Sequence, residues 1–305
     1  MTTSDTDSQL ATDHDVVVVG GGPAGCSAGV FTARYGLETA IFDRGRSSIK
    51  QCAYLENYLG FPGGIDIETL YGLMYDHAED AGCELVSDMV EAVERCDDGF
   101  AVETQDGRRV TARRVVAATR YDGEYLRPLD GDAMFETYEY DGKSHEQFDR
   151  SYPEVDGTTP VDGLYVASPS DETDHQTIMA AGRGARVGLT LVEDHRRERG
   201  YPDALAAEYD WMRREAELDD ELDDRDRWRE LFDDRLPDDH DLPEERLAEL
   251  REREIDRRID TYLPRSEIKR RTEQGHRRLL DHVDDDLILE AAREITAERQ
   301  SETNE

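Results

Sequence analysis

The glycine-rich segment Gly20-Gly-Gly-Pro-Ala-Gly25 constrains the fold of this chain more than any other feature. It follows Val16–Val19, a β-branched run typical of a strand buried on both faces of a parallel sheet. It precedes an apolar stretch with helical spacing that ends at Gly36, and a second strand, Thr39–Phe42, comes next. In this context the G-x-G-x-x-G pattern predicts a dinucleotide-binding βαβ unit.

Each glycine of the pattern has a physical role. Gly20 permits the tight turn, Gly22 leaves room for a pyrophosphate, and Gly25 lets the helix approach the strand. The helix N-terminus then presents N–H groups and its positive dipole end to the phosphates. Asp43 ends the second strand, where a carboxylate accepts hydrogen bonds from ribose hydroxyls. The alternative is a glycine turn that only packs the helix on the strand.

The rest of the chain predicts further elements of an α/β domain. We expect a helix over 66–81, β-like segments at 84–87, 100–104 and 110–119, a strand at 163–168 and a helix over 176–193. The predicted fold class is a Rossmann-like domain, a parallel sheet with helices plus a small β-meander, followed by an α-helical extension. The expected organisation is a disordered acidic tail at 1–13, the Rossmann-like domain at 14–195 with a short insert at 120–160, and a charged helical region at 196–305. In that region the stripe Leu247, Leu250, Ile255, Ile259 and Leu263 predicts a core or a homodimer face.

The net charge of the chain limits the kinds of partner that it can bind. The 305 residues carry 73 Asp and Glu against 37 Lys and Arg, a net charge of −36. Such a surface repels nucleic-acid phosphates and anionic lipid, so we expect neither nucleic acid nor membrane as a partner. No signal peptide or long apolar run is evident, which predicts a cytoplasmic location. Lysine occurs only at 50, 143 and 269, and this excess of carboxylates over lysine indicates a halophilic protein.

The cysteines and tyrosines give weaker indications of function than the glycine motif does. Cys26 and Cys83 lie in apolar context and read as core residues, whereas Cys52, in a polar loop, is the one candidate reactive thiol. No C-x-x-C or metal-ligand spacing occurs, so no metal site is expected. Four tyrosines are interpreted as a cover for a sheet edge, with a cofactor-lining role as the alternative: Tyr121, Tyr125, Tyr138 and Tyr140. A second cluster is interpreted as a solvated turn: Asp171, Glu172, Asp174 and His175.

Several segments, in order, resemble the FAD-binding half of the thioredoxin-reductase-like pyridine nucleotide–disulfide oxidoreductases. They are the N-terminal unit, the loop Glu56-Asn-Tyr-Leu-Gly-Phe-Pro62, the strand 115–119, the segment 161–167, and Gln176 with Ala180-Ala-Gly182. The resemblance covers about residues 14–120 and 160–193 and implies FAD as cofactor, with Asn57, Gln176 and Thr177 near the flavin. The expected cofactor-binding residues are Gly20, Gly21, Gly22, Pro23, Ala24, Gly25, Asp43, Arg44, Asn57, Val90, Thr119, Gln176 and Thr177.

The sequence also departs from that family. Only about 40 residues separate Thr119 from Val161, whereas an inserted NADPH domain needs about 100 or more. The family's redox C-x-x-C is absent, its Ala-Thr-Gly reads Ala-Thr-Arg120, and its Gly-Asp reads Ser168-Pro169. Arg120 could supply a replacement phosphate contact or block the site.

These observations leave three hypotheses about function. The first is an FAD-dependent oxidoreductase related to thioredoxin reductase, without its own NADPH domain or dithiol, which takes electrons from a partner protein or a diffusible donor. The second is a non-catalytic dinucleotide-binding regulatory or interaction protein, and the third is an NAD-dependent enzyme. The sequence assigns no catalytic residue, substrate or electron donor.

Overall fold

The computed structural model describes residues 12–120, 123–171, 176–207, 212–218, 222–237, 240 and 242–303. The chain forms two compact units, Met1–Val192 and Glu193–Glu305. The domain boundary expected after residue 195 and the disordered tail stay predictions. None of the described helices combines the length and the apolar character that crossing a bilayer requires.

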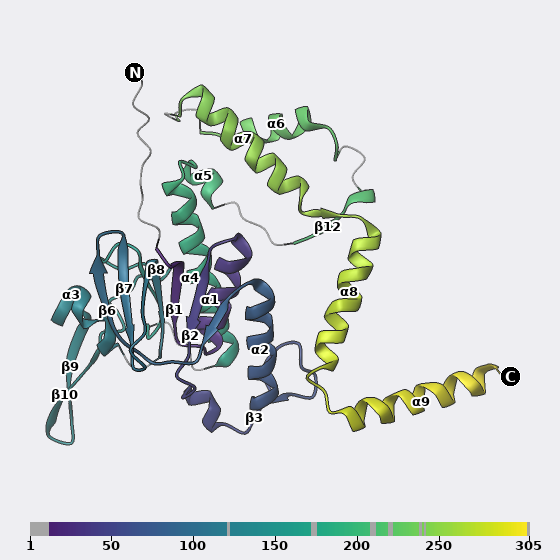
Figure 1. Cartoon of the computed structure of the whole chain (residues 1–305), viewed down its shortest axis with the longest axis horizontal. Coiled ribbons are helices and arrows are strands. Elements are labelled where there is room, and N and C mark those ends of the chain that lie inside the picture. Colours follow the sequence, from purple (N-terminus) through teal and green to yellow (C-terminus); the bar gives the residue numbers. More distant parts are fainter. Residues whose placement is uncertain are drawn as a thin grey trace. The chain divides into compact units, whose positions relative to one another are not determined.

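A seven-stranded sheet forms the centre of the first unit (Figure 1). Its strands run in the order β5-β2-β1-β8-β7-β6, and β11 also pairs with β8. They are β1 (His14–Val19), β2 (Thr39–Phe42), β5 (Glu84–Val86), β6 (Val90–Cys96), β7 (Gly99–Thr104), β8 (Arg109–Ala118) and β11 (Leu164–Ser168). The pairs β1–β2, β1–β8, β2–β5 and β8–β11 are parallel, while β6, β7 and β8 form an antiparallel meander. The predicted fold class, a parallel sheet with helices and a small meander, is confirmed.

Alternate residues of β1 pack on opposite faces of the sheet. Val16 and Val18 join one core cluster with α1 (Pro23–Tyr35) and α4 (Thr177–Glu198). Val17 and Val19 join another, made largely by the meander and the segment after β8. All four valines are at most 4% exposed, which confirms a strand buried on both faces.

The helices begin and end where their capping residues require. Gly36 ends α1 with a φ of 101°, a left-handed conformation that glycine adopts without steric cost. Asp66 caps α2 (Ile67–Ala81) by accepting a hydrogen bond from the Thr69 N–H at 2.9 Å. Between β2 and α2 lie η1 (Ser48–Gln51), β3 (Tyr54–Leu55) and β4 (Ile65–Asp66).

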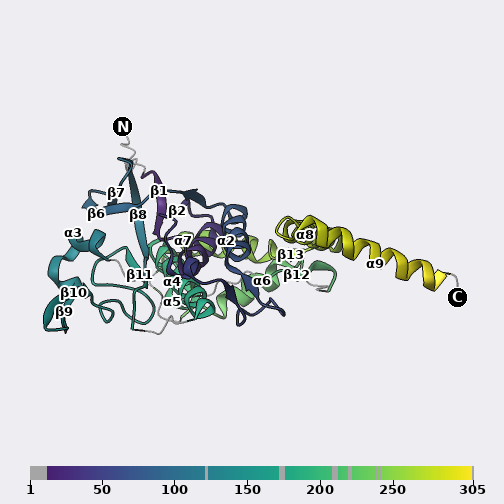
Figure 2. The ribbon, with the colours of Figure 1, turned by 90° about the horizontal axis from the view of Figure 1, so that it is seen from below.

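The insert between β8 and β11 contains structure that the sequence did not predict. After η2 (Glu124–Leu126), α3 (Arg127–Asp130) and η3 (Gly131–Met134), the strands β9 (Phe135–Tyr140) and β10 (Lys143–Phe148) form a separate hairpin (Figures 1 and 2). Most of its side chains are exposed on both faces, so its sequence lacks the alternation of apolar and polar residues that predicts a strand. Tyr138 and Tyr140 lie exposed on this hairpin, which corrects the expectation that they cover the main sheet. Tyr121 lies outside the described residues.

The second unit is mainly helical. It contains α5 (Asp203–Ala206), β12 (Arg214–Glu215), η4 (Ala216–Leu218), α6 (Arg225–Asp233), α7 (Glu244–Ile259), β13 (Tyr262–Leu263), α8 (Arg265–Leu280) and α9 (Asp285–Thr303). Leu250 is fully buried and packs with Tyr201, Leu205 and Phe232, with Leu247 against them. The leucine stripe of α7 thus contributes to the core of this unit.

A buried ion pair also holds this unit together. The Arg196 guanidinium donates to Glu254 Oε2 at 3.2 Å and to the Leu205 carbonyl at 2.8 Å, and it lies 4.2 Å from the centre of the Tyr201 ring. Both charged side chains are at most 4% exposed. Glu254 accepts a further hydrogen bond from Arg257 Nε at 3.0 Å, so the buried carboxylate is well satisfied.

We expect Glu254→Ala to lower the free energy of unfolding of this unit by about 3–5 kcal/mol, because Arg196 would stay buried without its counter-charge. The double variant Arg196→Met/Glu254→Leu should lose much less, since it removes both charges and keeps the volume. Urea unfolding followed by tryptophan fluorescence measures this, because both tryptophans occur after residue 193 in the sequence. Equal losses in the two variants would contradict the ion-pair account.

Candidate functional site

A cavity of about 600 Å³ opens at the carboxyl ends of the parallel strands. Its lining comes from the glycine turn after β1, the loop after β2, the ends of β8 and β11, and the start of α4. Ligands of open α/β sheets bind at this edge, since the turns that follow the strands converge there.

The three glycines of the motif differ in what surrounds them. Gly20 has a φ of 113°, and a Cβ on it would lie 2.4 Å from the Ala118 carbonyl oxygen. A Cβ on Gly25 would lie 1.7 Å from the Gly20 carbonyl oxygen, so both glycines are needed for the turn itself. A Cβ on Gly22 would meet only Ser47 Oγ, at 3.6 Å. Gly22 therefore borders open space in the cavity.

The N-terminus of α1 adds hydrogen-bond donors to this cavity. Its N-cap, Gly22, makes no side-chain cap, and its first turn contains no acidic residue. The first N–H groups of a helix have no partner within the helix. Since Gly22, Pro23 and Ala24 line the cavity, an anion placed there would meet these donors and the positive end of the helix dipole.

Asp43 ends β2 and is already held in place by its neighbours. Its carboxylate accepts hydrogen bonds from the Gly45 N–H at 3.0 Å and from the Tyr75 hydroxyl, and Lys50 Nζ lies 3.8 Å from Oδ2. Burial, then the contact with Asp43, raises the pKa of Tyr75, so its hydroxyl remains a donor. A carboxylate offers about four acceptor positions, so Asp43 can still accept ribose hydroxyls.

Two segments that are distant in sequence meet beside the cavity. Asn57 Nδ2 donates to Gln176 Oε1 at 2.6 Å, across 119 residues of sequence. Close packing of α4 on α1 positions Gln176, because a Cβ on Gly184 would lie 1.9 Å from the Ala24 carbonyl oxygen. Only a glycine at this crossing allows the start of α4 to reach the glycine turn.

The structure gathers most of the sequence-predicted site residues. Those that line the cavity are Gly20, Gly21, Gly22, Pro23, Ala24, Asp43, Arg44, Val90, Thr119, Gln176 and Thr177. Gly25 lies behind the turn, and Asn57 reaches the site through its bond to Gln176. Their roles as cofactor ligands stay predictions.

Basic side chains line the cavity although the chain as a whole is acidic. They are Arg44, Arg46 and Arg120, and Arg120 Nη1 donates to Ser48 Oγ at 2.6 Å. Arg120 has a φ of 68°, an uncommon conformation for a residue other than glycine. An arginine therefore stands where the resemblance implies a glycine, and its side chain crosses toward the loop after β2.

Sequence reasoning missed several lining residues. They are chiefly Arg46, Ser47, Ser48 and Met89, while Tyr125 was named only in the less favoured cofactor-lining alternative. Three of them belong to the loop that directly follows β2. A loop in that position opens at the same sheet edge as the glycine turn, and this signal could have identified them.

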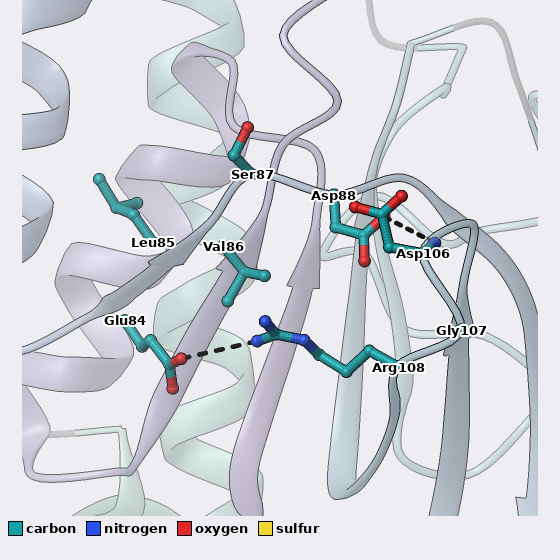
Figure 3. A pocket seen from close by; sticks show the side chains of 8 residues that line it. All are labelled: Glu84, Leu85, Val86, Ser87, Asp88, Asp106, Gly107 and Arg108. Carbon is teal, nitrogen blue, oxygen red and sulfur yellow. Dashed lines mark hydrogen bonds and ion pairs between the residues drawn. The ribbon is translucent and has the colours of Figure 1, made fainter.

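A second cavity, of about 400 Å³, lies between β5 and the turn that joins β7 to β8 (Figure 3). Glu84 reaches across it to Arg108 at 4.0 Å, and the Asp106 N–H donates to Asp88 Oδ1 at 3.4 Å. Asp88 lines both cavities. Among the described residues, no group of His, Cys, Asp and Glu side chains could hold a metal ion.

Fold and cavity together define a Rossmann-like α/β domain with a cavity at the carboxyl edge of its sheet. Residues 14–132 match the family model of the pyridine nucleotide-disulphide oxidoreductases. This segment is similar to the thioredoxin-reductase-like proteins of that family.

Individual relatives are thioredoxin reductases. That of Aquifex aeolicus is 32% identical over 108 residues, which are 35% of this chain and 33% of the relative. A bifunctional thioredoxin reductase/thioredoxin of Mycobacterium leprae is 34% identical over 125 residues, 40% of this chain and 27% of the relative. A solved thioredoxin reductase from Gloeobacter violaceus aligns with a TM-score of 0.49 and 18% identity, over 63% of this chain and 97% of that chain. The chain thus spans about a third of the length of the curated relatives it matches.

The cysteines should differ sharply in reactivity. Burial raises the pKa of Cys26 and of Cys83 to about 12, so at pH 8 both remain protonated and unreactive. Cys52 is exposed and lines the cavity. We expect a thiol reagent to modify Cys52 in the native protein before Cys26 and Cys83, as peptide mass mapping would show. Modification of Cys26 ahead of Cys52 would contradict the described packing of α1.

Proposed function

We propose that the cavity binds FAD and that the chain is an FAD-dependent oxidoreductase related to thioredoxin reductase, without its own NADPH-binding domain or redox dithiol. One observation carries the proposal. The Asn57–Gln176 hydrogen bond joins the two segments expected near the flavin beside the cavity that the glycine turn opens. A turn that only packed a helix on a strand would not need this convergence.

The residues present fit the proposed cofactor. The open space at Gly22 and the N–H groups of α1 suit a pyrophosphate, and Arg120 adds a positive charge beside them. Asp43 retains acceptor capacity for ribose hydroxyls. Asn57 and Gln176 restrain each other, so their amides would be ordered before a flavin arrives.

Bound FAD would supply electron transfer, which no side chain of this cavity provides. The chain's own residues would hold and orient the cofactor. The segment 123–160 contains short helices and a hairpin in place of a nucleotide-binding domain, which supports the absence of an internal NADPH site in the described part of the insert. Electrons would then come from a partner protein or a diffusible donor.

The cavity also contains an observation that favours the second hypothesis, a non-catalytic nucleotide-binding protein. Arg120 spans from the end of β8 to Ser48, and this side chain occupies space in the cavity. If it stays there, the cavity takes a smaller phosphorylated ligand and no flavin. The position of the Arg120 side chain therefore distinguishes the two proposed functions.

We expect protein purified in molar KCl to bind FAD and to show flavin absorbance bands that dithionite bleaches. Salt is needed because self-repulsion of a net charge of −36 opposes folding. Gly22→Val should abolish FAD binding with unchanged circular dichroism, because the new side chain fills the pyrophosphate position. Gly275→Val is the matched control, since an added Cβ there meets nothing within 4 Å. A folded, colourless wild type that takes up no FAD would refute the proposal.

We expect Arg120→Gly to weaken FAD binding about 10- to 150-fold, the loss that follows from removing a hydrogen bond to a charged group. Glycine relieves the positive φ at this position, so stability should not fall. Isothermal titration with FAD measures the change. Tighter FAD binding in Arg120→Gly would mean that the arginine blocks the flavin, and would favour the non-catalytic function.

A further inference from the structure

The side chains of α8 and α9 are less buried than those of the other helices in the second unit. Neither helix contains a buried residue, although they span 16 and 19 residues. In proteins most helix stability comes from packing of an apolar face. Large apolar side chains on and between these helices remain exposed: Leu279, Leu280, Val283, Leu287, Leu289 and Ile295, each between 43% and 60%. The two helices thus present apolar surface without a partner in the described part of the chain.

The two helices carry opposite charge. Helix α8 has six basic and two acidic residues, a net charge of +4. Helix α9 has six acidic and two basic residues, a net charge of −4. A cationic helix is unusual in a chain with a net charge of −36, and its charge matches that of the helix that follows it.

The charges also lie beside the apolar positions. On α8, Arg271 and Arg278 are seven residues apart and flank the side that carries Ile268 and Leu279. On α9, Glu290 and Glu294 stand three and seven residues after Leu287, so they flank the side that carries this leucine.

The acidic side chains of α9 lower the stability of that helix when it has no partner. Like charges at i,i+4 destabilise an isolated helix, and no basic side chain of the described residues lies within ion-pair distance of Glu290 or Glu294. On α8, by contrast, Glu267 and Glu273 are already paired with Arg270, Arg271 and Lys269. The net charges of the two helices, positive on α8 and negative on α9, are therefore complementary.

We propose that α8 and α9 are a self-complementary surface whose partner is a second copy of this chain. In a two-fold dimer, α8 of one protomer packs against α9 of its partner, and the reverse contact forms at the same time. Each contact buries the exposed leucines and isoleucines and places basic side chains of α8 beside acidic side chains of α9. The long-range repulsion between two chains of net charge −36 falls away at molar salt, where charges interact only over about 3 Å.

Charge reversal with mixing tests this surface. One variant carries Arg271→Glu and Arg278→Glu, and the other carries Glu290→Arg and Glu294→Arg. Each variant alone would place like charges against each other in both contacts, so each should be monomeric, with a dimer dissociation constant raised about tenfold or more. In an equimolar mixture both contacts are complementary again. The mixture should therefore regain a mass twice the 34.7 kDa of the chain in light scattering in molar KCl.

Two controls make the outcomes decisive. Arg109→Glu with Lys143→Glu changes the net charge outside these helices by the same amount as the first variant and should stay dimeric. A chain with all four substitutions keeps both contacts complementary and should stay dimeric, whereas a hairpin of α8 on α9 within one copy would leave the wild type monomeric and could not be restored by mixing. A monomeric wild type, single variants that stay dimeric, or a mixture that stays monomeric would each overturn the proposal. None of these results depends on FAD, so the test is separate from that of the proposed function.

Discussion

The close approach of backbone to backbone at the glycine turn is the constraint on which the first unit depends. A Cβ at Gly25 would collide with the Gly20 carbonyl, and one at Gly20 would collide with Ala118. Without side chains at these positions, α1 begins directly over the ends of β1 and β8. That placement opens the cavity and aims the helix N-terminus into it. A second glycine contact, Gly184 against Ala24, brings α4 to the same edge.

Much of this arrangement was predictable from the sequence because it rests on short-range rules. The valine run of β1, the glycine spacing and Gly36 as a helix stop each specify local backbone geometry. Once strands and helices alternate in this way, the parallel sheet and the position of its ligand edge follow. The predicted site residues converge for that reason.

Other features depend on contacts that no local pattern records. The β9–β10 hairpin has mostly exposed side chains, and its sequence therefore lacks apolar alternation. The hydrogen bond between Asn57 and Gln176 joins positions 119 residues apart, and only the family resemblance placed the two near one ligand. The hydrogen bond from Arg120 to Ser48 likewise joins positions 72 residues apart, and the sequence alone does not specify the positive φ of Arg120.

FAD binding in this cavity is tested most directly by a crystal structure of the chain grown with FAD in molar KCl. We expect the pyrophosphate at Gly20–Ala24, a ribose at Asp43 and the flavin beside Asn57 and Gln176. A cofactor bound elsewhere, or a cavity in which Arg120 keeps its bond to Ser48 and no FAD density is present, would contradict it.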